Sequence, residues 1–204
     1  RAVIGITIEE AEVRAQPALR DRWLVVGQQE EEDNRLRSQR TWLWAEQHQR
    51  AALVLDFAYG NNPLDKTLIP GQVLDADIAF YPGSYLQRAV VVKQHAVAEA
   101  IKSRPAGAAA TLDDALEHYA TALACNPWIE TMLLLLDMVW VEVHGSTWVL
   151  RDCNNQSLPM SRHSDAGWPL LALSGGHPVL LAAEWNGANL LPLGLWIDAV
   201  FHGV

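Results

Sequence analysis

Thr111-Leu112-Asp113-Asp114-Ala115 opens the C-terminal half of the chain, and Thr7-Ile8-Glu9-Glu10-Ala11 opens the N-terminal half with the same pattern. Each stretch has a hydroxyl residue, an aliphatic residue, two acids and an alanine. A threonine suits the N-cap of a helix, where its oxygen accepts a backbone N–H, and the helix dipole favours acids in the first turn. The pattern therefore predicts a helix at the start of each half.

The two predicted helices differ in length. In the second, apolar residues recur at helical spacing and predict an amphipathic helix that ends before Asn126-Pro127, because the residue before a proline disfavours helix. These residues are Leu112, Ala115, Leu116, Tyr119, Ala120, Leu123 and Ala124. The first helix is shorter, since Pro17 must end or kink it.

A tryptophan and then strands follow each helix. Trp23-Leu24-Val25-Val26 follows the first, and Trp128 with the run Met132 to Leu136 follows the second. Each half later has a Thr-Trp strand, Thr41 to Trp44 and Thr147 to Leu150, at nearly equal separations from the opening threonine. This parallel suggests a duplicated helix-plus-sheet unit. Chance agreement between short runs of common residues is the alternative.

Further strands are predicted by alternation. Leu74, Ala76, Ile78 and Phe80 form an apolar face, with Asp75 and Asp77 pointing the other way. Asn186-Gly187 predicts a tight hairpin between the strand that ends at Trp185 and the one that begins at Leu190, with Pro192 at an edge or a strand end. The remaining predicted strands are 53–57, 89–92 and 139–143. The fold class is therefore α+β and rich in antiparallel strands, because strands and helices do not alternate as in a doubly wound sheet.

Composition divides the 204 residues into two lobes. After Pro105 the basic residues are Arg151 and Arg162, so most of the net charge of −9 lies in the second lobe. The division predicts an N-terminal lobe over 1–102, a linker rich in small residues over 103–110 and an acidic lobe over 111–204. The charge disfavours nucleic acid as a partner, and no apolar run reaches the roughly 18 residues of a membrane span.

Aromatic and acidic residues supply the candidate interaction surface. Trp42 and Trp44 share a strand face and could stack on a sugar or a small molecule, although nine tryptophans beside predicted strands are also explained by core packing. Glu30, Glu31 and Glu32 precede Asp33 and predict a solvated hairpin tip, or a docking patch for a basic partner.

The sequence gives only weak indications of a catalytic or metal-binding site. Asp75 and Asp77 could bind a cation or share a proton, and Ser161-Arg162-His163-Ser164-Asp165 holds the letters of a hydrolase triad in adjacent positions. A triad needs side chains from separate elements, so a polar loop is the better interpretation. Cys125 and Cys153 show no zinc-ligand spacing. We therefore assign no catalytic residue, cofactor or metal ligand to this chain.

The chain resembles the region that follows the zinc finger in bacterial SWIM zinc-finger proteins. The resemblance is clearest over residues 19–92 and is carried by Leu19 to Gln28, Arg40 to Trp44, Ala52 to Ala58, Ile69-Pro70-Gly71, Phe80 to Gly83 and Leu86 to Ala89. It implies a cytoplasmic protein whose Cys-x-Cys…Cys-x-His finger binds zinc. Neither cysteine belongs to such a pair, so the resemblance places the finger, and the zinc, before Arg1.

Three functions follow as hypotheses. The first is a non-enzymatic interaction or scaffold region that binds a protein partner, with MoxR-type ATPases or von Willebrand A-type proteins as the partners that the resemblance implies. The second is a small-molecule or carbohydrate-binding module that uses Trp42 and Trp44. The third is an unrecognised hydrolase that uses His163 or the Asp75 and Asp77 pair.

Overall fold

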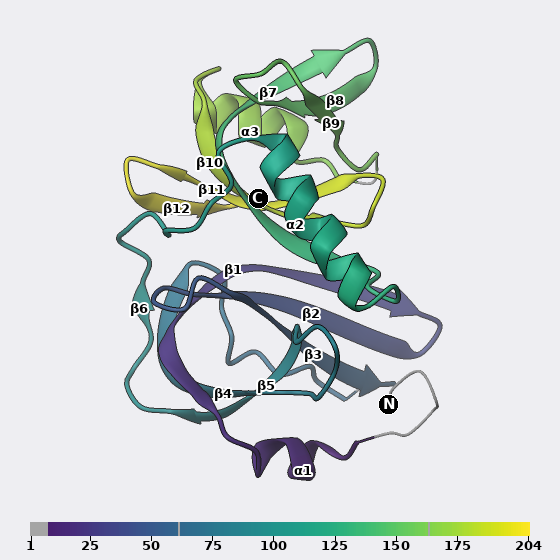
Figure 1. Ribbon diagram of the computed structural model, residues 1–204, viewed down its shortest axis with the longest axis vertical. Helices are drawn as coiled ribbons and strands as arrows, with labels where there is room; N and C mark the ends of the chain where they lie inside the picture. Colours follow the sequence, from purple (N-terminus) through teal and green to yellow (C-terminus); the bar gives the residue numbers. More distant parts are fainter. Residues whose placement is uncertain (1–7, 61, 163) are drawn as a thin grey trace. The chain divides into compact units, whose positions relative to one another are not determined.

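The computed structural model describes residues 8–60, 62–162 and 164–204 (Figure 1). The protein is mostly β, with 48% of the described residues in strands and 14% in helices. Its contacts divide it into two compact units, one ending at Ile101 and the other comprising Lys102–Val204. None of the helices in the described part of the chain has the length and apolar character to cross a bilayer.

The described residues of the N-terminal unit form one short helix and six strands. Its first strand follows the helix, as predicted for the run that begins at Trp23, and extends from Leu19 through the acidic run to a hairpin. The elements are α1 (Glu10–Arg14), β1 (Leu19–Asp33), β2 (Leu36–Ala45), β3 (Ala51–Tyr59), β4 (Gln72–Phe80), β5 (Arg88–Gln94) and β6 (Glu99–Ala100).

Five of these strands close into a barrel. β1 pairs antiparallel with β2 on one side and with β4 on the other, β2 pairs with β3, and β4 pairs with β5. The ring is completed by a short parallel pairing of β3 with β5, which joins Leu53 to Arg88 and Val54 to Ala89. β6 pairs antiparallel with the first residues of β4. Closure removes the open edges that a flat sheet would expose.

The barrel interior is apolar at one end. Trp23, Val25, Leu43, Leu74 and Ile78 are buried together, which confirms the predicted apolar face of β4. The outside of β4 and β5 is covered by α1, whose Val13 packs on Ala79 and Val90. α1 begins at Glu10, so the predicted start at Ile8 is wrong; Glu9 occupies the N-cap without a side-chain hydrogen bond. Thr7 lies outside the described residues.

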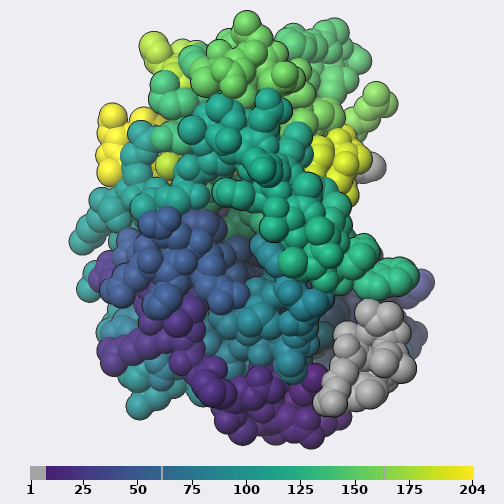
Figure 2. Space-filling view, in the orientation of Figure 1, coloured from purple at the N-terminus to yellow at the C-terminus, as the bar shows by residue number. Residues whose placement is uncertain are grey.

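Two helices and six strands form the described part of the C-terminal unit. They are α2 (Leu112–Cys125), β7 (Met132–His144), β8 (Thr147–Arg151), β9 (Ser157–Pro159), α3 (Gly167–Ser174), β10 (Val179–Trp185), β11 (Leu190–Ile197) and β12 (Val200–Gly203). α2 has the predicted bounds, and its N-cap Thr111 accepts a hydrogen bond from the backbone N–H of Asp114. The outer side of this helix lies on the surface in Figure 2.

The same order of pairings recurs in this unit. β7 pairs with β8 and with β10, β8 pairs with β9, and β10 pairs with β11, all antiparallel. Met160, just after β9, forms a parallel bridge with Leu190 at the start of β11, and Ser161 N–H donates to the Leu190 carbonyl at 2.7 Å. This bridge corresponds to the β3–β5 pairing. The recurrence supports the duplication hypothesis, which stays a prediction at the level of sequence.

The predicted hairpin at Asn186-Gly187 is confirmed, because Trp185 pairs with Leu190 across it. Pro192, however, is buried inside β11 and not at an edge or a strand end. The register of β10 against β11 shifts between Ala182 and Ala183, and Pro192 lies opposite Ala183 at that irregularity. A bulge accepts a proline because the ladder there does not require every N–H.

Candidate functional site

The predicted tryptophan pair belongs to the outer face of the N-terminal barrel. Leu43 and Ala45 point into the barrel interior, so Trp42 and Trp44 point outward. Their exposed fractions are nevertheless 0% and 8%, and neither ring offers a face to solvent in this structure. In the described part of the chain the exposed tryptophans are Trp128 and Trp168, which the sequence did not single out.

The acidic run forms the end of β1 and is exposed, as expected for a hairpin tip. Glu31 pairs with Ser38 and Asp33 pairs with Leu36, so these acids share the outer face with Trp42 and Trp44. Glu30 and Glu32 lie on the opposite side of the strand. The structure thus brings Glu31, but not Glu30 or Glu32, onto the face of the tryptophan pair.

Three large apolar side chains on this outer face were not predicted as a site. Leu36 pairs with Tyr59, and Phe57 lies two residues before Tyr59 on the same side of β3. Their exposed fractions are 45% for Leu36, 53% for Phe57 and 64% for Tyr59. We call Glu31, Asp33, Leu36, Phe57 and Tyr59 the hairpin face. The alternation of apolar residues on β3 continues through Phe57 and Tyr59 and was a usable signal for this surface. The exposure of these side chains, however, depends on where the strands extend beyond the barrel core.

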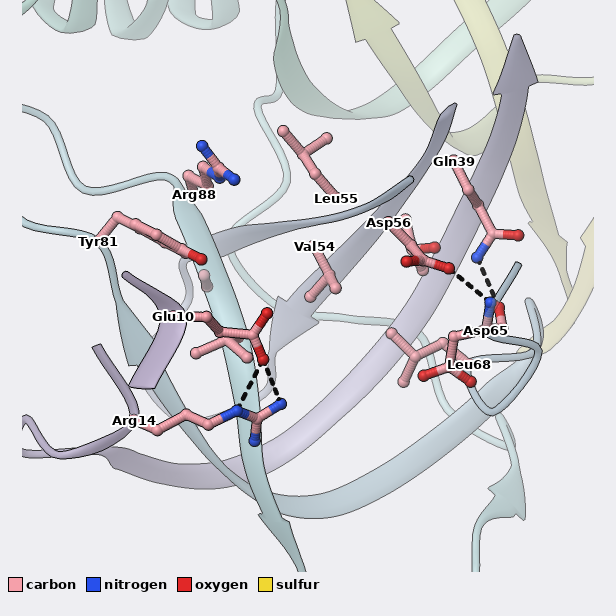
Figure 3. A pocket seen from close by; sticks show the side chains of 13 residues that line it. Glu10, Arg14, Gln39, Val54, Leu55, Asp56, Asp65, Leu68, Tyr81 and Arg88 are labelled. Atoms are coloured by element: carbon pink, nitrogen blue, oxygen red, sulfur yellow. Dashed lines mark hydrogen bonds and ion pairs between the residues drawn. The ribbon is translucent and has the colours of Figure 1, made fainter. Parts of the chain in front are cut away.

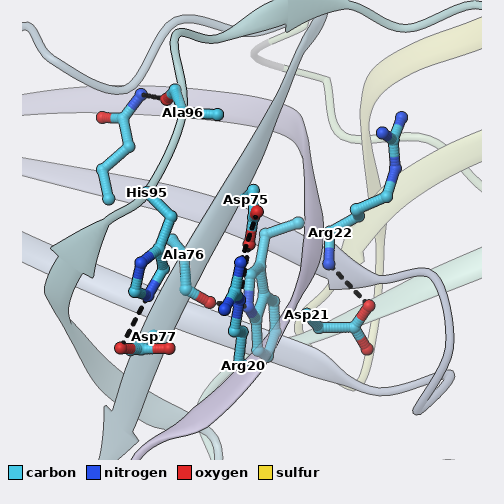
Figure 4. Close-up of polar contacts among 10 residues, drawn as sticks. Arg20, Asp21, Arg22, Asp75, Ala76, Asp77, His95 and Ala96 are labelled. Carbon is cyan, nitrogen blue, oxygen red and sulfur yellow. Dashed lines mark hydrogen bonds and ion pairs between the residues drawn. The ribbon is translucent and has the colours of Figure 1, made fainter.

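Asp75 and Asp77 are each engaged by a base (Figure 4). Both Asp75 oxygens accept from Arg20, at 3.0 and 2.9 Å, and the guanidinium holds the pKa of Asp75 below its usual value. Asp77 lies 2.8 Å from Nε2 of His95. The two carboxylates therefore serve separate contacts. His163, the other hydrolase candidate, lies outside the described residues.

Asp21 is a buried carboxylate that organises the turn between β2 and β3. It accepts from the backbone N–H groups of Arg22, Gln47 and His48, and Nδ1 of His48 lies 2.7 Å from Oδ2. Burial acts to raise the pKa of Asp21. The hydrogen bonds from the His48 imidazole and from the three backbone groups outweigh burial and leave the pKa below its ordinary value.

Asp21→Asn is expected to destabilise the N-terminal unit by about 1–2 kcal/mol at neutral pH. A lowered folded-state pKa means that Asp21 contributes its full stability above the unfolded value of about 4 and loses it as pH falls through the lower folded value. Urea unfolding at about pH 7 and about pH 3 checks this, because the gap between wild type and variant should shrink on acidification. An equal gap at both pH values would contradict it.

A cavity of about 160 Å³ opens the N-terminal barrel where β3 and β5 separate (Figure 3). The two strands pair at Leu53–Arg88 and Val54–Ala89, and beyond these positions they diverge. The wall is completed by β2, by α1, by Tyr81 and by the segment 65–68. Glu10, Arg14, Gln39, Thr41, Val54, Leu55, Asp56, Asp65, Leu68, Tyr81, Arg88, Ala89 and Val90 line it.

Cations and acceptors occupy opposite ends of this cavity (Figure 3). At one end Arg14 is bound to Glu10 at 2.7 Å, and the Arg88 guanidinium lies 4.3 Å from the centre of the Tyr81 ring. At the other end lie Gln39, Asp56 and Asp65. The cavity can therefore distinguish the two ends of a polar ligand.

Hydrogen bonds from the barrel position the acceptor end. Gln39 Nε2 donates to the Asp65 carbonyl at 2.8 Å, and Gln28 Nε2 donates to the Leu68 carbonyl at 3.2 Å. The Asp65 N–H donates to Oδ2 of Asp56 at 2.5 Å, and the Thr67 N–H donates to Oδ1 of Asp65 at 2.9 Å. The segment is thus held on the barrel by contacts that a sequence does not display.

The residues that the structure describes contain no group of three His, Cys, Asp or Glu side chains placed to hold a metal ion. Cys125 and Cys153 are both free and exposed. Comparison with protein-family models, with curated proteins and with solved structures gave no match. Function is therefore inferred from the geometry.

Proposed function

We propose that this chain is a non-enzymatic interaction module that binds a protein segment on the hairpin face of its N-terminal barrel. The observation that carries the proposal is the cross-strand grouping of Leu36, Phe57 and Tyr59, each at least 45% exposed, beside an acidic strand end. Large apolar side chains exposed together are typical of sites that bind partners. Aromatic side chains supply much of the binding energy at such sites.

The charge around the hairpin face defines the partner. Glu31 is paired with Arg40 at 2.8 Å, and the neighbouring Glu30 and Glu32 are exposed. Asp33 accepts from the side chain of Asn34. A complementary segment presents apolar side chains flanked by lysine or arginine, because the four acids at the end of β1 outnumber the three arginines of the hairpin, Arg35, Arg37 and Arg40.

The barrel connectivity is consistent with a binding role. A five-stranded barrel in which the first strand pairs with the second and the fourth, and the third with the fifth, is the connectivity of OB-type barrels. Those barrels bind ligands on the face of their second and third strands. The apolar residues of the hairpin face, Leu36, Phe57 and Tyr59, lie on β2 and β3. This support is an analogy at the level of fold and does not by itself assign a ligand.

The resemblance to bacterial SWIM zinc-finger proteins extends the proposal. On that basis the module is cytoplasmic and belongs to a parent protein whose zinc finger binds the metal. MoxR-type ATPases and von Willebrand A-type proteins are then the first partners to examine. The small-molecule hypothesis that uses Trp42 and Trp44 has less support, because both rings are buried.

Phage display of random peptides on the purified chain tests the proposal. We expect enriched sequences to combine aromatic or aliphatic residues with lysine or arginine. The double variant Phe57→Ser/Tyr59→Ser should weaken the best peptide at least tenfold, since it removes two exposed apolar anchors. Isothermal titration calorimetry measures the loss.

A matched control replaces two exposed aromatic or aliphatic residues elsewhere, Trp128→Ser and Val97→Ser, and should leave the affinity unchanged. The double serine variant must keep its circular dichroism spectrum. The proposal is wrong if no basic and apolar peptide is enriched, or if the enriched peptides bind the Phe57 and Tyr59 variant as tightly as wild type.

A further inference from the structure

The acceptor end of the β3–β5 cavity has more acceptors than donors. Gln39 is 3% exposed, and its Oε1 has no hydrogen-bond partner among the described residues. Its Nε2 already donates to the Asp65 carbonyl, and exchanging the two amide atoms would set oxygen against oxygen. The unpartnered oxygen is therefore a fixed acceptor. A buried acceptor without a donor has lost its hydration without compensation, so a donor at this position is favoured.

The two aspartates add acceptors at the same end (Figure 3). Asp56 accepts one backbone hydrogen bond at each oxygen, from Phe57 and from Asp65, whereas an ionised carboxylate offers about four acceptor positions. Oδ1 of Asp65 accepts from Thr67. The cations that line the cavity lie at the other end, where Arg14 is bound to Glu10 and to the Val91 carbonyl.

Apolar side chains connect the two ends. Val54 and Leu68 line the cavity between the basic and the acceptor end. A volume of about 160 Å³ is that of about five water molecules in the liquid. This volume is sufficient for a short alkyl stem with one polar head.

We infer that this cavity binds a cationic group with several N–H donors on a short alkyl stem, namely a guanidinium or a primary ammonium. The stem contacts Val54 and Leu68, and the head donates to Gln39 Oε1 and to the carboxylates of Asp56 and Asp65. Two sources present this chemistry, a free small molecule or an arginine or lysine side chain of a partner. The inference does not rest on the hairpin face, which lies on the outside of the barrel.

Titration of the isotope-labelled chain with N-butylguanidinium and with N-butylammonium tests the inference, with neutral N-butylurea as the matched ligand. We expect the side-chain amide signals of Gln39 and the backbone signals of Thr41 to shift with either cation and not with the urea. The peptide acetyl-Gly-Arg-Gly-amide, against its neutral citrulline counterpart, distinguishes the sources. Shifts with the peptide indicate a partner's side chain, and shifts with the free cation alone indicate a small molecule.

Asp65→Asn is the matched variant, because asparagine keeps an oxygen for the Thr67 N–H and replaces the charge. It should weaken cation binding at least fivefold, whereas Glu99→Gln on β6 should not change it. The wild-type titration does not depend on how the variant folds. The inference is overturned if neither cation shifts Gln39 and Thr41, if the urea binds equally, or if a folded Asp65→Asn binds like wild type. The two proposals can fail separately. If the cation binds but Phe57→Ser/Tyr59→Ser binds peptides as tightly as wild type, this inference stands and only the proposed docking surface is wrong.

Discussion

Asp152→Ala is expected to destabilise the C-terminal unit by about 3 kcal/mol, since it removes a charged acceptor from three backbone donors. Asp152 is fully buried. Its Oδ2 accepts from the Leu112 N–H at 2.9 Å, and its Oδ1 accepts from the N–H groups of Asn154 and Gln156 at 2.9 Å each. One side chain thus joins the first residue of α2 to the turn between β8 and β9.

Native-state hydrogen exchange is the measurement, because a chain with two units need not unfold in a single step. The amides of Leu112, Asn154 and Gln156 should lose protection first. Asp152→Asn keeps one acceptor oxygen and should cost less than alanine. Asp113→Ala, an exposed acid in the first turn of α2, should cost below about 1 kcal/mol through the helix dipole alone. A cost for Asp152→Ala as small as that for Asp113→Ala would refute the assignment.

Trp23→Ala is expected to destabilise the N-terminal barrel by about 4 kcal/mol, because it leaves a large cavity in a closed core. Trp23 has no exposed surface and packs with Val25, Leu43 and Ile78. Its indole N–H donates to the Ala76 carbonyl on β4 at 3.1 Å, across the β1–β4 pairing that closes the barrel. The loss therefore affects both the core and the closure.

Denaturant unfolding followed by circular dichroism checks this prediction. Trp23→Phe keeps most of the ring volume and loses the hydrogen bond, so about 1–2 kcal/mol is expected. Trp168→Ala, at an exposed tryptophan of the C-terminal unit, should leave the N-terminal barrel unchanged. If Trp23→Ala costs no more than Trp23→Phe, the ring does not fill the core as described.

Candidate sites were harder to predict than strands. The sequence identified Trp42, Trp44 and the acids of β1, and the structure places Glu31 on the face of the tryptophan pair while both rings are buried. Leu36, Phe57 and Tyr59 were missed because exposure depends on where the hairpin leaves the core. The cavity of Gln39, Asp56 and Asp65 was missed because its residues come from separate elements.

Local chemistry was readable from the sequence alone. The capping of α2 by Thr111 and the hairpin at Asn186-Gly187 depend on residues close together in the chain, so their side chains determine the backbone conformation directly. The apolar face of β4 likewise follows from alternation at a period of two.

Only the tertiary structure decided that the strands of the N-terminal unit close into a barrel, that Pro192 is buried at a bulge, and that a cavity opens between β3 and β5. Pairings such as β1 with β4 join residues distant in the chain, and their stability depends on all the strands that they close. No short stretch carries that information, because the free energy of closure belongs to the ring of strands and not to any one of them.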